Sequence, residues 1–232
     1  MSRPAAVAVV VPARDEEELL PACLDAVAHA QEALGRAHPD VPTCTFVVLD
    51  ACRDRTPAVV AARPSVVAVP SLAGNVGAAR ALGVEAAARW ARATTDGPLW
   101  VAGTDADSVV PSHWLTAQVE MAAAGRDLVV GTVTPRRADL PPELHAAWVA
   151  AHDAGDGHPH VHGANLGFSL RAYEHVGGFA PLAVHEDVAL VTAMHAAGLD
   201  VLATGAVAVT TSGRRSGRAP HGFAHYLDGL GA

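Results

Sequence analysis

Short runs of β-branched residues alternate with longer alanine-rich segments through the first half of the chain, and this alternation constrains the fold more than any other feature. Apolar runs of strand length, separated by segments of helix length, are typical of parallel strands joined by covering helices. We therefore predict an α/β fold with a mostly parallel central sheet flanked by helices. The expected strands are 6–11, 46–49, 66–69 and 99–102, and the expected helices are 15–34, 56–62 and 76–92.

The second half of the chain is less regular. A stretch rich in proline, glycine and histidine, 135–163, is expected to form loops. The residues after 212 hold arginines among glycines and prolines, which is typical of a loop that becomes ordered when a ligand binds. The helices expected here are 112–124 and 186–197. The expected extended segments are 128–134, 165–170 and 201–209, the last of them with a turn.

Composition limits what such a chain can do. A length of 232 residues suits one sizeable domain, and a half-apolar composition with 17% charged residues is enough to bury a core. The net charge of -8 gives no support for a nucleic-acid partner or for general attraction to anionic lipid. Every basic residue is arginine, which excludes a Walker phosphate loop and any mechanism that needs a catalytic lysine.

The pattern of cysteines and the length of the apolar runs indicate the cellular compartment that suits this chain. The 3 cysteines form no CxxC pair, so neither a disulfide framework nor a structural zinc site is expected, and a reducing cytoplasm fits. The longest apolar runs, such as 5–11, are well short of the roughly 20 residues that cross a bilayer. No signal-peptide core follows the first residues. We therefore expect a soluble cytoplasmic protein without a transmembrane segment.

Carboxylates follow the expected strands at the points where those strands end. Asp15 and Glu16 come after the first strand, Asp50 after the second, and Asp105 and Asp107 after the fourth. Ligands of open α/β sheets bind at this carboxyl edge. Gathered there, the carboxylates would repel one another unless a cation or a hydrogen-bonding ligand lay among them.

Among these carboxylates, the pair Asp105 and Asp107 points most specifically to a metal site. Their spacing on a strand-to-loop segment can aim both carboxylates at one centre while Ala106 faces away. Hard oxygen ligands suit Mg²⁺ or Mn²⁺, which complete their coordination with substrate phosphates. The alternative is an ordinary turn that precedes a helix capped by Ser112.

Six motifs, in their order along the chain, resemble those of the family-2 glycosyltransferases of the GT-A fold. The resemblance covers nearly the whole chain and implies a single Rossmann-like GT-A domain over 1–232. Its nucleotide-binding half would be 1–110, and its acceptor-binding half, with the arginine-containing tail, 111–232. The motifs are VVVPARDEE (9–17), VVLDACRDRT (47–56), GNVGAARALG (74–83), GTDADSVVP (103–111), GANLGFSLRAYEHVGGF (163–179) and HEDVAL (185–190).

The resemblance implies a donor site for a nucleoside-diphosphate sugar, either a UDP- or a GDP-sugar. The first two loops would hold the nucleobase and ribose, and Arg80 would lie near the base or the phosphates. Asp105 would face the ribose, and Asp107 would bind the Mn²⁺ or Mg²⁺ that bridges the donor diphosphate. The implied nucleotide-binding residues are Pro12, Ala13, Arg14, Glu16, Asp50, Arg80 and Asp105.

The second loop departs from the family pattern. The usual motif reads Asp-Asp-Gly-Ser-x-Asp-x-Thr, whereas this chain has Leu-Asp-Ala-Cys at 49–52 before Asp54 and Thr56. The nucleobase preference is therefore left open. For Asp54 and Thr56 the alternative to ligand binding is helix capping and a turn.

Transfer with inversion needs a base that takes the proton of the acceptor hydroxyl. By the resemblance this base is Asp187, at the start of an expected helix; the alternative is that Glu186 and Asp187 only complement the positive end of the helix dipole. The residues that could contact the sugar or the acceptor are Asn165, Glu186 and Trp114, and Trp114 could equally fill the core.

The tail offers further groups for the donor. Guanidinium forks match phosphate geometry, so the tail arginines could close over the diphosphate as a lid, or could belong to a solvated loop. By the resemblance, one tail histidine could add a ligand to the metal. The arginines are Arg214, Arg215 and Arg218, and the histidines are His221 and His225.

Three alternating histidines, His158, His160 and His162, would share one face of an extended segment. Such a face can bind zinc or nickel, and the alternative is an adventitious or acceptor-side role.

The leading hypothesis is an inverting, divalent-metal-dependent glycosyltransferase with an acceptor that the sequence does not identify. One alternative is a nucleotide-sugar-binding protein without transfer activity. Another is a nucleotidyltransferase of related fold, although the glycine-rich loop typical of that class does not follow the first strand. A dinucleotide oxidoreductase is disfavoured because no GxGxxG follows the first strand either.

Overall fold

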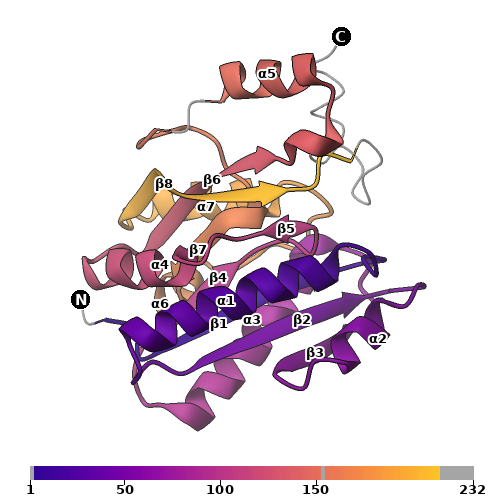
Figure 1. The fold of residues 1–232 in the computed structure, drawn as a ribbon. Coiled ribbons are helices and arrows are strands. Elements are labelled where there is room, and N and C mark those ends of the chain that lie inside the picture. The colour runs from indigo at the N-terminus through magenta and orange to yellow at the C-terminus, as the bar shows by residue number, and fades with distance from the viewer. Residues whose placement is uncertain (1–2, 153–154, 215–232) are drawn as a thin grey trace.

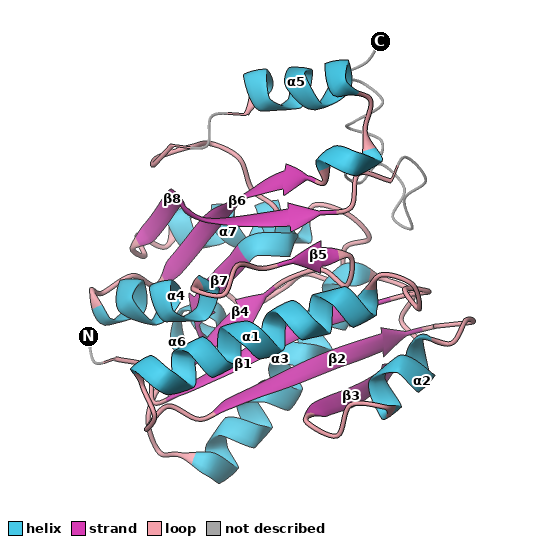
Figure 2. Cartoon of the chain, in the orientation of Figure 1, coloured by secondary structure: helices cyan, strands magenta, loops and turns pink. Residues whose placement is uncertain are grey.

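The structure, a computed structural model, describes residues 3–152 and 155–214, and its described strands form one sheet (Figures 1 and 2). The order across the sheet is β3-β2-β1-β4-β7-β6-β8-β5. Strands β1 to β4 run parallel, β7 runs antiparallel to both of its neighbours, and β6 and β8 are parallel. This confirms the predicted α/β fold with a mostly parallel sheet. The strands are β1 (Ala6–Ala13), β2 (Thr43–Asp50), β3 (Val66–Ser71), β4 (Leu99–Gly103), β5 (Ser108–Val109), β6 (Leu128–Pro135), β7 (Leu166–Ser169) and β8 (Val201–Thr211).

Helices cover both faces of the sheet, and the alternation of side chains along β1 explains why. Val7, Val9 and Val11 point into one apolar core, and Ala6, Ala8 and Val10 point into the other. Figure 1 shows α1 in front of the strands and α3 behind them. The first face carries α1 (Leu20–Ala37), α2 (Thr56–Ala61) and α4 (Trp114–Ala123), and the second carries α3 (Val76–Thr94), α6 (Leu170–His175) and α7 (Glu186–Ala196).

Helix α1 begins at Leu20, five residues later than the predicted start at 15. Pro21 stands in its first turn, where a proline costs no hydrogen bond. The carboxylates before it are engaged elsewhere, since Asp15 and Glu17 accept hydrogen bonds from the backbone of the loop after β2. The segment that was predicted as the first helical turn is therefore a loop of the sheet edge.

The expectation of loops throughout 135–163 is wrong in part. A short 3₁₀ helix, Arg137–Asp139, and helix α5 (Pro142–Ala151) lie in this stretch. Helix α5 buries only Trp148, which packs with Leu140 and Leu144 in a small cluster apart from the two main cores. Because so little of α5 faces a core, its sequence has no marked apolar stripe to predict it from.

Two further boundaries differ from the sequence prediction. Strand β7 ends at Ser169, because the Ser169 side chain caps α6 by accepting a hydrogen bond from the Ala172 amide at 3.2 Å. Strand β8 continues to Thr211 instead of turning before 209. A shift in its register against β6, between Gly131 and Val133, takes the place of the expected turn.

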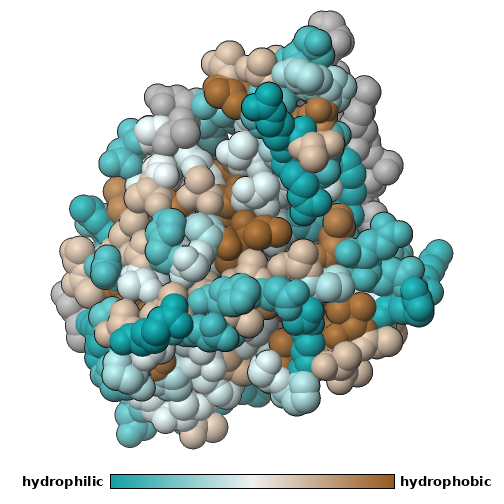
Figure 3. Space-filling model, viewed as in Figure 1, coloured by the Kyte–Doolittle hydropathy of each residue, from teal (hydrophilic) through white to brown (hydrophobic). Residues whose placement is uncertain are grey.

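On the face seen in Figure 3, hydrophobic residues occur in small separate groups among hydrophilic ones. Scattered groups of this kind are ordinary for a folded surface. Within residues 3–152 and 155–214, no helix combines the length and the apolar character that crossing a membrane requires.

Candidate functional site

The loops after β1 and β2 are tied to each other, because these strands are neighbours in the sheet and end at the same edge. The Asp15 carboxylate accepts hydrogen bonds from the backbone amides of Arg53 at 2.6 Å and Asp54 at 3.3 Å. In return, the amide of Glu17 donates to Asp54 at 3.0 Å. The carboxylates that follow separate strands therefore gather at one edge, as their positions in the sequence predicted.

Asp54 and Thr56 fill the structural role that was the alternative to ligand binding. Asp54 Oδ1 accepts hydrogen bonds from the Thr56 amide at 2.8 Å and the Thr56 hydroxyl at 2.6 Å, where α2 begins. The Thr56 hydroxyl accepts in turn from the amide of Glu16 at 2.7 Å. The pair starts a helix and fixes the backbone of the first loop.

Three residues other than glycine adopt left-handed backbone conformations among the described residues, and each lies in a loop of this edge. They are Asp15 (φ 54°), Ala51 (φ 52°) and His185 (φ 63°). Such conformations cost energy and concentrate at functional sites. Ala51 occupies the position where the resembling motif has glycine.

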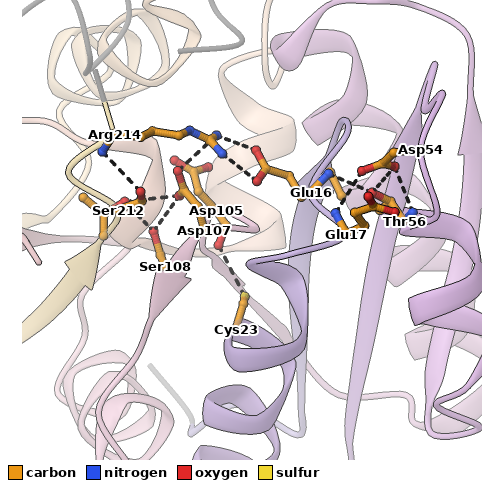
Figure 4. A network of polar contacts seen from close by, with 12 residues as sticks. Glu16, Glu17, Cys23, Asp54, Thr56, Asp105, Asp107, Ser108, Ser212 and Arg214 are labelled. Carbon is orange, nitrogen blue, oxygen red and sulfur yellow. Dashed lines mark hydrogen bonds and ion pairs between the residues drawn. The ribbon is translucent and has the colours of Figure 1, made fainter. Parts of the chain in front are cut away.

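An arginine bridges the first loop to the DxD segment (Figure 4). The guanidinium of Arg214, which follows β8, contacts both carboxylate oxygens of Glu16, one of them at 2.7 Å. Its Nη2 lies 3.2 Å from Oδ2 of Asp107. Asp107 also accepts a hydrogen bond from the Thr211 hydroxyl at 3.2 Å. The first and the last described loops therefore meet at Asp107.

Negative charge is concentrated at this point. Burial and the nearby carboxylate of Asp105 raise the pKa of Asp107 to about 6, against the opposing effect of Arg214. A cation at Asp107 relieves that repulsion. Asp107 and Asp105 both line one cavity and offer hard oxygen donors, which suit Mg²⁺ or Mn²⁺ when substrate phosphates supply the remaining ligands.

The donor set therefore fits a divalent metal, although the described residues contain no group of three metal-ligating side chains close enough to hold one by themselves. Four residues predicted for the metal or the lid lie outside the described residues: Arg215, Arg218, His221 and His225.

Arg80 was expected near the base or the phosphates, and the structure places it beneath the DxD loop. Its side chain is 4% exposed and donates to Asp105 at 2.5 Å and to Glu186 at 2.9 Å. It therefore joins α3, the DxD loop and the start of α7. Gly163 packs against the guanidinium, and a Cβ at this position would approach Nη2 to 2.5 Å, so only glycine fits.

Asp187, the predicted base, stands at the start of α7 with its carboxylate held by two backbone donors. The amide of Gly163 donates to Oδ2 at 2.6 Å, and the amide of Val188 donates to Oδ1 at 2.8 Å. These contacts fix the orientation of the carboxylate, and Asp187 remains partly exposed.

One cavity of about 460 Å³ connects these motifs. Carboxylates, Arg80, His185 and several valines line it. Four further ring-bearing residues, Trp148, His152, His160 and His162, also line it, and we call these four the aromatic wall. The carboxylates that line it are Asp105, Asp107, Glu186 and Asp187.

The alternating histidines do share one face, as predicted. The ring centroids of His158 and His160 lie 6.0 Å apart, and those of His160 and His162 lie 6.4 Å apart, each pair with an interplanar angle of 18°. Because the rings stack instead of converging on one point, this geometry does not support the zinc or nickel alternative.

Sequence reasoning missed the partners of these histidines. The His152 ring lies 3.4 Å from the Trp148 ring and 4.5 Å from the His160 ring, measured between centroids. The signal that could have revealed them is the four-residue spacing of Trp148 and His152 after a Pro-Pro start, which puts both rings on one side of a helix.

Trp114 and Asn165 were expected to face the sugar or the acceptor, and the structure corrects this. Trp114 is completely buried, and its Nε1 donates to Asn165 Oδ1 at 2.9 Å. Asn165 Nδ2 donates to the carbonyls of Thr132 and Val207. Both side chains are committed to the core. Glu186 does line the cavity, but it is 4% exposed and is paired with Arg80.

Asp50 holds the third loop from inside. Its carboxylate accepts hydrogen bonds from the Ser71 hydroxyl and from the amides of Gly74 and Asn75. At 4% exposure it has little surface for a ribose in this conformation. Arg14 reaches the carbonyl of Gly74 at 3.4 Å, so the first and third loops also meet.

The remaining two predicted nucleotide-binding residues, Pro12 and Ala13, are the last residues of β1. The carbonyl of Ala13 accepts a hydrogen bond from the Cys52 thiol at 3.3 Å.

Comparison with known proteins gives one family and one fold. The sequence profile of glycosyl transferase family 2 matches residues 8–171. No curated protein matches the chain. Solved structures of glycosyltransferases share its fold at low sequence identity, which confirms the predicted GT-A-type architecture.

Three solved structures illustrate the likeness. TarS of S. aureus in complex with UDP superposes with a TM-score of 0.60 at 12% identity, over 91% of this chain and 61% of that one. The mannosyltransferase PcManGT of Pyrobaculum calidifontis, in complex with GDP-Man and Mn²⁺, has a TM-score of 0.61 at 20% identity, over 98% of this chain and 69% of that one. GalNAc-T7 with UDP, GalNAc and Mn²⁺ has a TM-score of 0.65 at 11% identity, over 93% of this chain and 46% of that one. The chain thus spans about 61% of the length of the TarS structure.

Proposed function

This chain belongs to glycosyl transferase family 2, and on that premise we propose that it transfers a sugar from a nucleoside-diphosphate donor to an acceptor hydroxyl, with inversion at the transferred carbon. The observation that carries the proposal is the single cavity lined by both Asp107 and Asp187. A residue suited to the donor diphosphate and a residue suited to the acceptor proton therefore face the same space. Complexes of similar folds with UDP and with GDP-Man support a nucleotide sugar as donor.

The donor is assigned to the edge formed by residues 1–110. Pro12 and Ala13 end β1 there, Arg14 and Glu16 belong to the loop that follows, and Asp50 contributes by shaping the third loop from inside. Arg80 fixes Asp105 in place through their ion pair. The half 111–232 supplies Asp187 and the aromatic wall for the acceptor.

Asp107, with Asp105 beside it, would hold Mn²⁺ or Mg²⁺, and the metal would neutralise the diphosphate that leaves. Mn²⁺ is present in the structures of PcManGT and GalNAc-T7. Arg214 would exchange its contacts with Glu16 and Asp107 for the diphosphate oxygens, because a guanidinium fork binds phosphate in the same two-point manner as carboxylate.

Asp187 would take the proton from the acceptor hydroxyl as that oxygen attacks the sugar. The amides of Gly163 and Val188 keep the carboxylate oriented while this happens. The ion pair between Arg80 and Glu186 holds the start of α7, and with it Asp187, at a fixed place relative to the DxD loop.

The test is release of nucleoside diphosphate from a panel of UDP- and GDP-sugars with Mn²⁺, with and without candidate acceptors. Asp187→Asn keeps the shape of the side chain and removes its basicity, so transfer falls at least about 100-fold. Donor affinity, measured by calorimetry, stays at the wild-type value. Asp25→Asn, on the exposed side of α1, serves as the matched control. Wild-type turnover by Asp187→Asn overturns the assignment of the base.

A further inference from the structure

We propose that the cavity in front of Asp187 binds an uncharged acceptor with a flat apolar face, and that this face rests on the aromatic wall. The inference rests on the proposed function, because it names the acceptor class of the same site. Three observations carry it: the arrangement of the rings in the wall, the pKa values of the wall histidines, and the charges of the other residues that line the cavity.

The rings of the wall form two nearly parallel pairs and line the same cavity as the carboxylates. His152 stacks on Trp148 with an interplanar angle of 11°, and His160 and His162 are within 18° of parallel. The two pairs are inclined to each other, with an angle of 35° between the rings of His152 and His160. Trp148 is buried behind the histidines, so the three imidazoles, all partly exposed, are the surface that a ligand meets. Val133, Val161, Val184 and Val188 complete the apolar lining.

Two of the wall histidines, His152 and His162, have lowered pKa values, which favours their neutral forms. Burial, followed by the neighbouring imidazoles of His152, His160 and His158, lowers the pKa of His162 to about 4. Burial also lowers the pKa of His152, against the opposing effect of its hydrogen bond to the Trp148 carbonyl. A neutral imidazole stacks on a flat apolar surface and offers a ring N–H at its edge to a hydroxyl.

The charged lining residues disfavour an anionic acceptor. Four carboxylates line the cavity, and the guanidinium of Arg80 is committed to Asp105 and Glu186. Among the described lining residues, no other arginine is available to a phosphate or carboxylate group. A negatively charged acceptor would therefore lose its hydration without gaining a partner.

A cationic acceptor is disfavoured by a different argument. Asp105 and Glu186 already share the guanidinium of Arg80, and Asp107 contacts Arg214. The remaining carboxylate is Asp187. A cation bound to it would make it a weaker base, since an opposite charge favours the ionised form. An uncharged hydroxyl compound leaves Asp187 able to accept the proton.

Binding to the full chain without donor tests this separately from transfer. The probes form a matched set on one sugar: phenyl glucoside (uncharged, with a flat group), glucose 6-phosphate (anionic) and glucosamine (cationic). Affinity is measured by calorimetry, and contact with the wall by the imidazole signals in NMR spectra. We expect phenyl glucoside to bind at least tenfold more tightly than either charged probe and to shift signals of wall histidines.

The variant His160→Ala removes the middle of the wall while leaving the buried Trp148 in place. It weakens phenyl glucoside binding by about tenfold, the factor that loss of one stacking contact produces. His175→Ala, on the exposed side of α6, is the matched control and keeps wild-type affinity. Circular dichroism confirms that both variants are folded.

The inference is overturned when a charged probe binds as tightly as phenyl glucoside, when the neutral probe shows no saturable binding, or when His160→Ala binds it with wild-type affinity. Donor binding and release of nucleoside diphosphate are measured on the same preparation. Normal donor turnover with any of these outcomes rejects the acceptor class and leaves the proposed function standing. Neutral-probe binding without any donor binding rejects the proposed function instead.

Discussion

Arg214 places a positive charge where the proposed donor site needs one. Its guanidinium contacts Glu16 and Asp107 and offsets part of the negative charge of the two acidic loops. A metal ion that binds Asp107 therefore competes with an internal cation. The exchange of the Arg214 guanidinium for a metal ion at Asp107 can therefore be tested by changing one side chain.

We expect Arg214→Ala to bind Mn²⁺ about tenfold more tightly than wild type without nucleotide, because one positive charge is removed next to Asp107. Electron paramagnetic resonance of free Mn²⁺ measures this directly. Transfer by the same variant falls, because the diphosphate loses its guanidinium partner. Arg126→Ala, which breaks the ion pair with Asp200, is the control. Unchanged Mn²⁺ affinity in Arg214→Ala contradicts the competition.

Ala51 carries local strain that glycine would remove. A residue with a Cβ at φ 52° costs roughly 1–2 kcal/mol, and the greater freedom of glycine in the unfolded chain offsets roughly 0.5–1 kcal/mol of the relief. Ala51→Gly should thus raise the free energy of unfolding by up to about 1 kcal/mol in urea titrations. Ala28→Gly, exposed within α1, should lower it by about 1 kcal/mol. A loss of stability in Ala51→Gly would show that the strain is absent.

At the level of elements, Arg80 joins α3, the DxD loop and α7 through two ion pairs. Arg80→Met leaves Glu186 as a buried, unpaired carboxylate, and breaking a buried pair in this way costs about 3–5 kcal/mol. Adding Glu186→Gln removes the stranded charge and should recover part of that loss. Urea unfolding of the two single variants and the double variant measures the coupling. Additive effects would mean that the two side chains do not interact.

The segment that bears His162 makes stability depend on pH. The folded-state pKa of about 4 lies below the ordinary value near 6.5, so between these values the unfolded chain binds a proton that the folded chain does not. Stability is therefore lost as pH falls from about 6.5 to about 4, by roughly 3 kcal/mol for this group. His162→Phe should flatten this part of the profile of unfolding free energy against pH. Equal slopes in both proteins contradict the shifted pKa.

The sequence predicted some elements well and others poorly, for physical reasons. Strands buried on both faces read as continuous apolar runs, which is why 6–11 and 46–49 lie within observed strands. Helix α5 buries one tryptophan and left no periodic signal. For the site, the positions of Asp15 and Asp107 just after predicted strands indicated that both lie at the carboxyl edge of the sheet. The burial of Trp114 and Asn165 depends on long-range packing, which local sequence does not encode.

On the scale of the whole molecule, one sheet runs through both proposed halves. Strand β4 pairs with β1 on one side and with β7 on the other, and β5, directly after the DxD loop, pairs with β8. Trp114 and Leu115 of α4 belong to the same core as α1. The two proposed halves therefore share one sheet and one apolar core.

It follows that residues 1–110 expressed alone should not fold, because β4 would lose its β7 partner and α1 would lose the apolar surface of α4. The expected results are weak near-ultraviolet circular dichroism and no cooperative unfolding transition, against a single transition for the full chain. A stable fragment with native spectra would show instead that the halves are independent units.

Gly163 follows His162 directly, and its amide holds the Asp187 carboxylate at 2.6 Å. In the proposed function, acceptor selection and the orientation of the base would therefore depend on two adjacent residues, His162 and Gly163. Changes at His162 that are meant to admit a new acceptor would also disturb the contact between the Gly163 amide and the Asp187 carboxylate. His152 follows the end of α5, a separate element, so changes there would leave this contact in place. Libraries aimed at altered acceptor scope should begin from that helix.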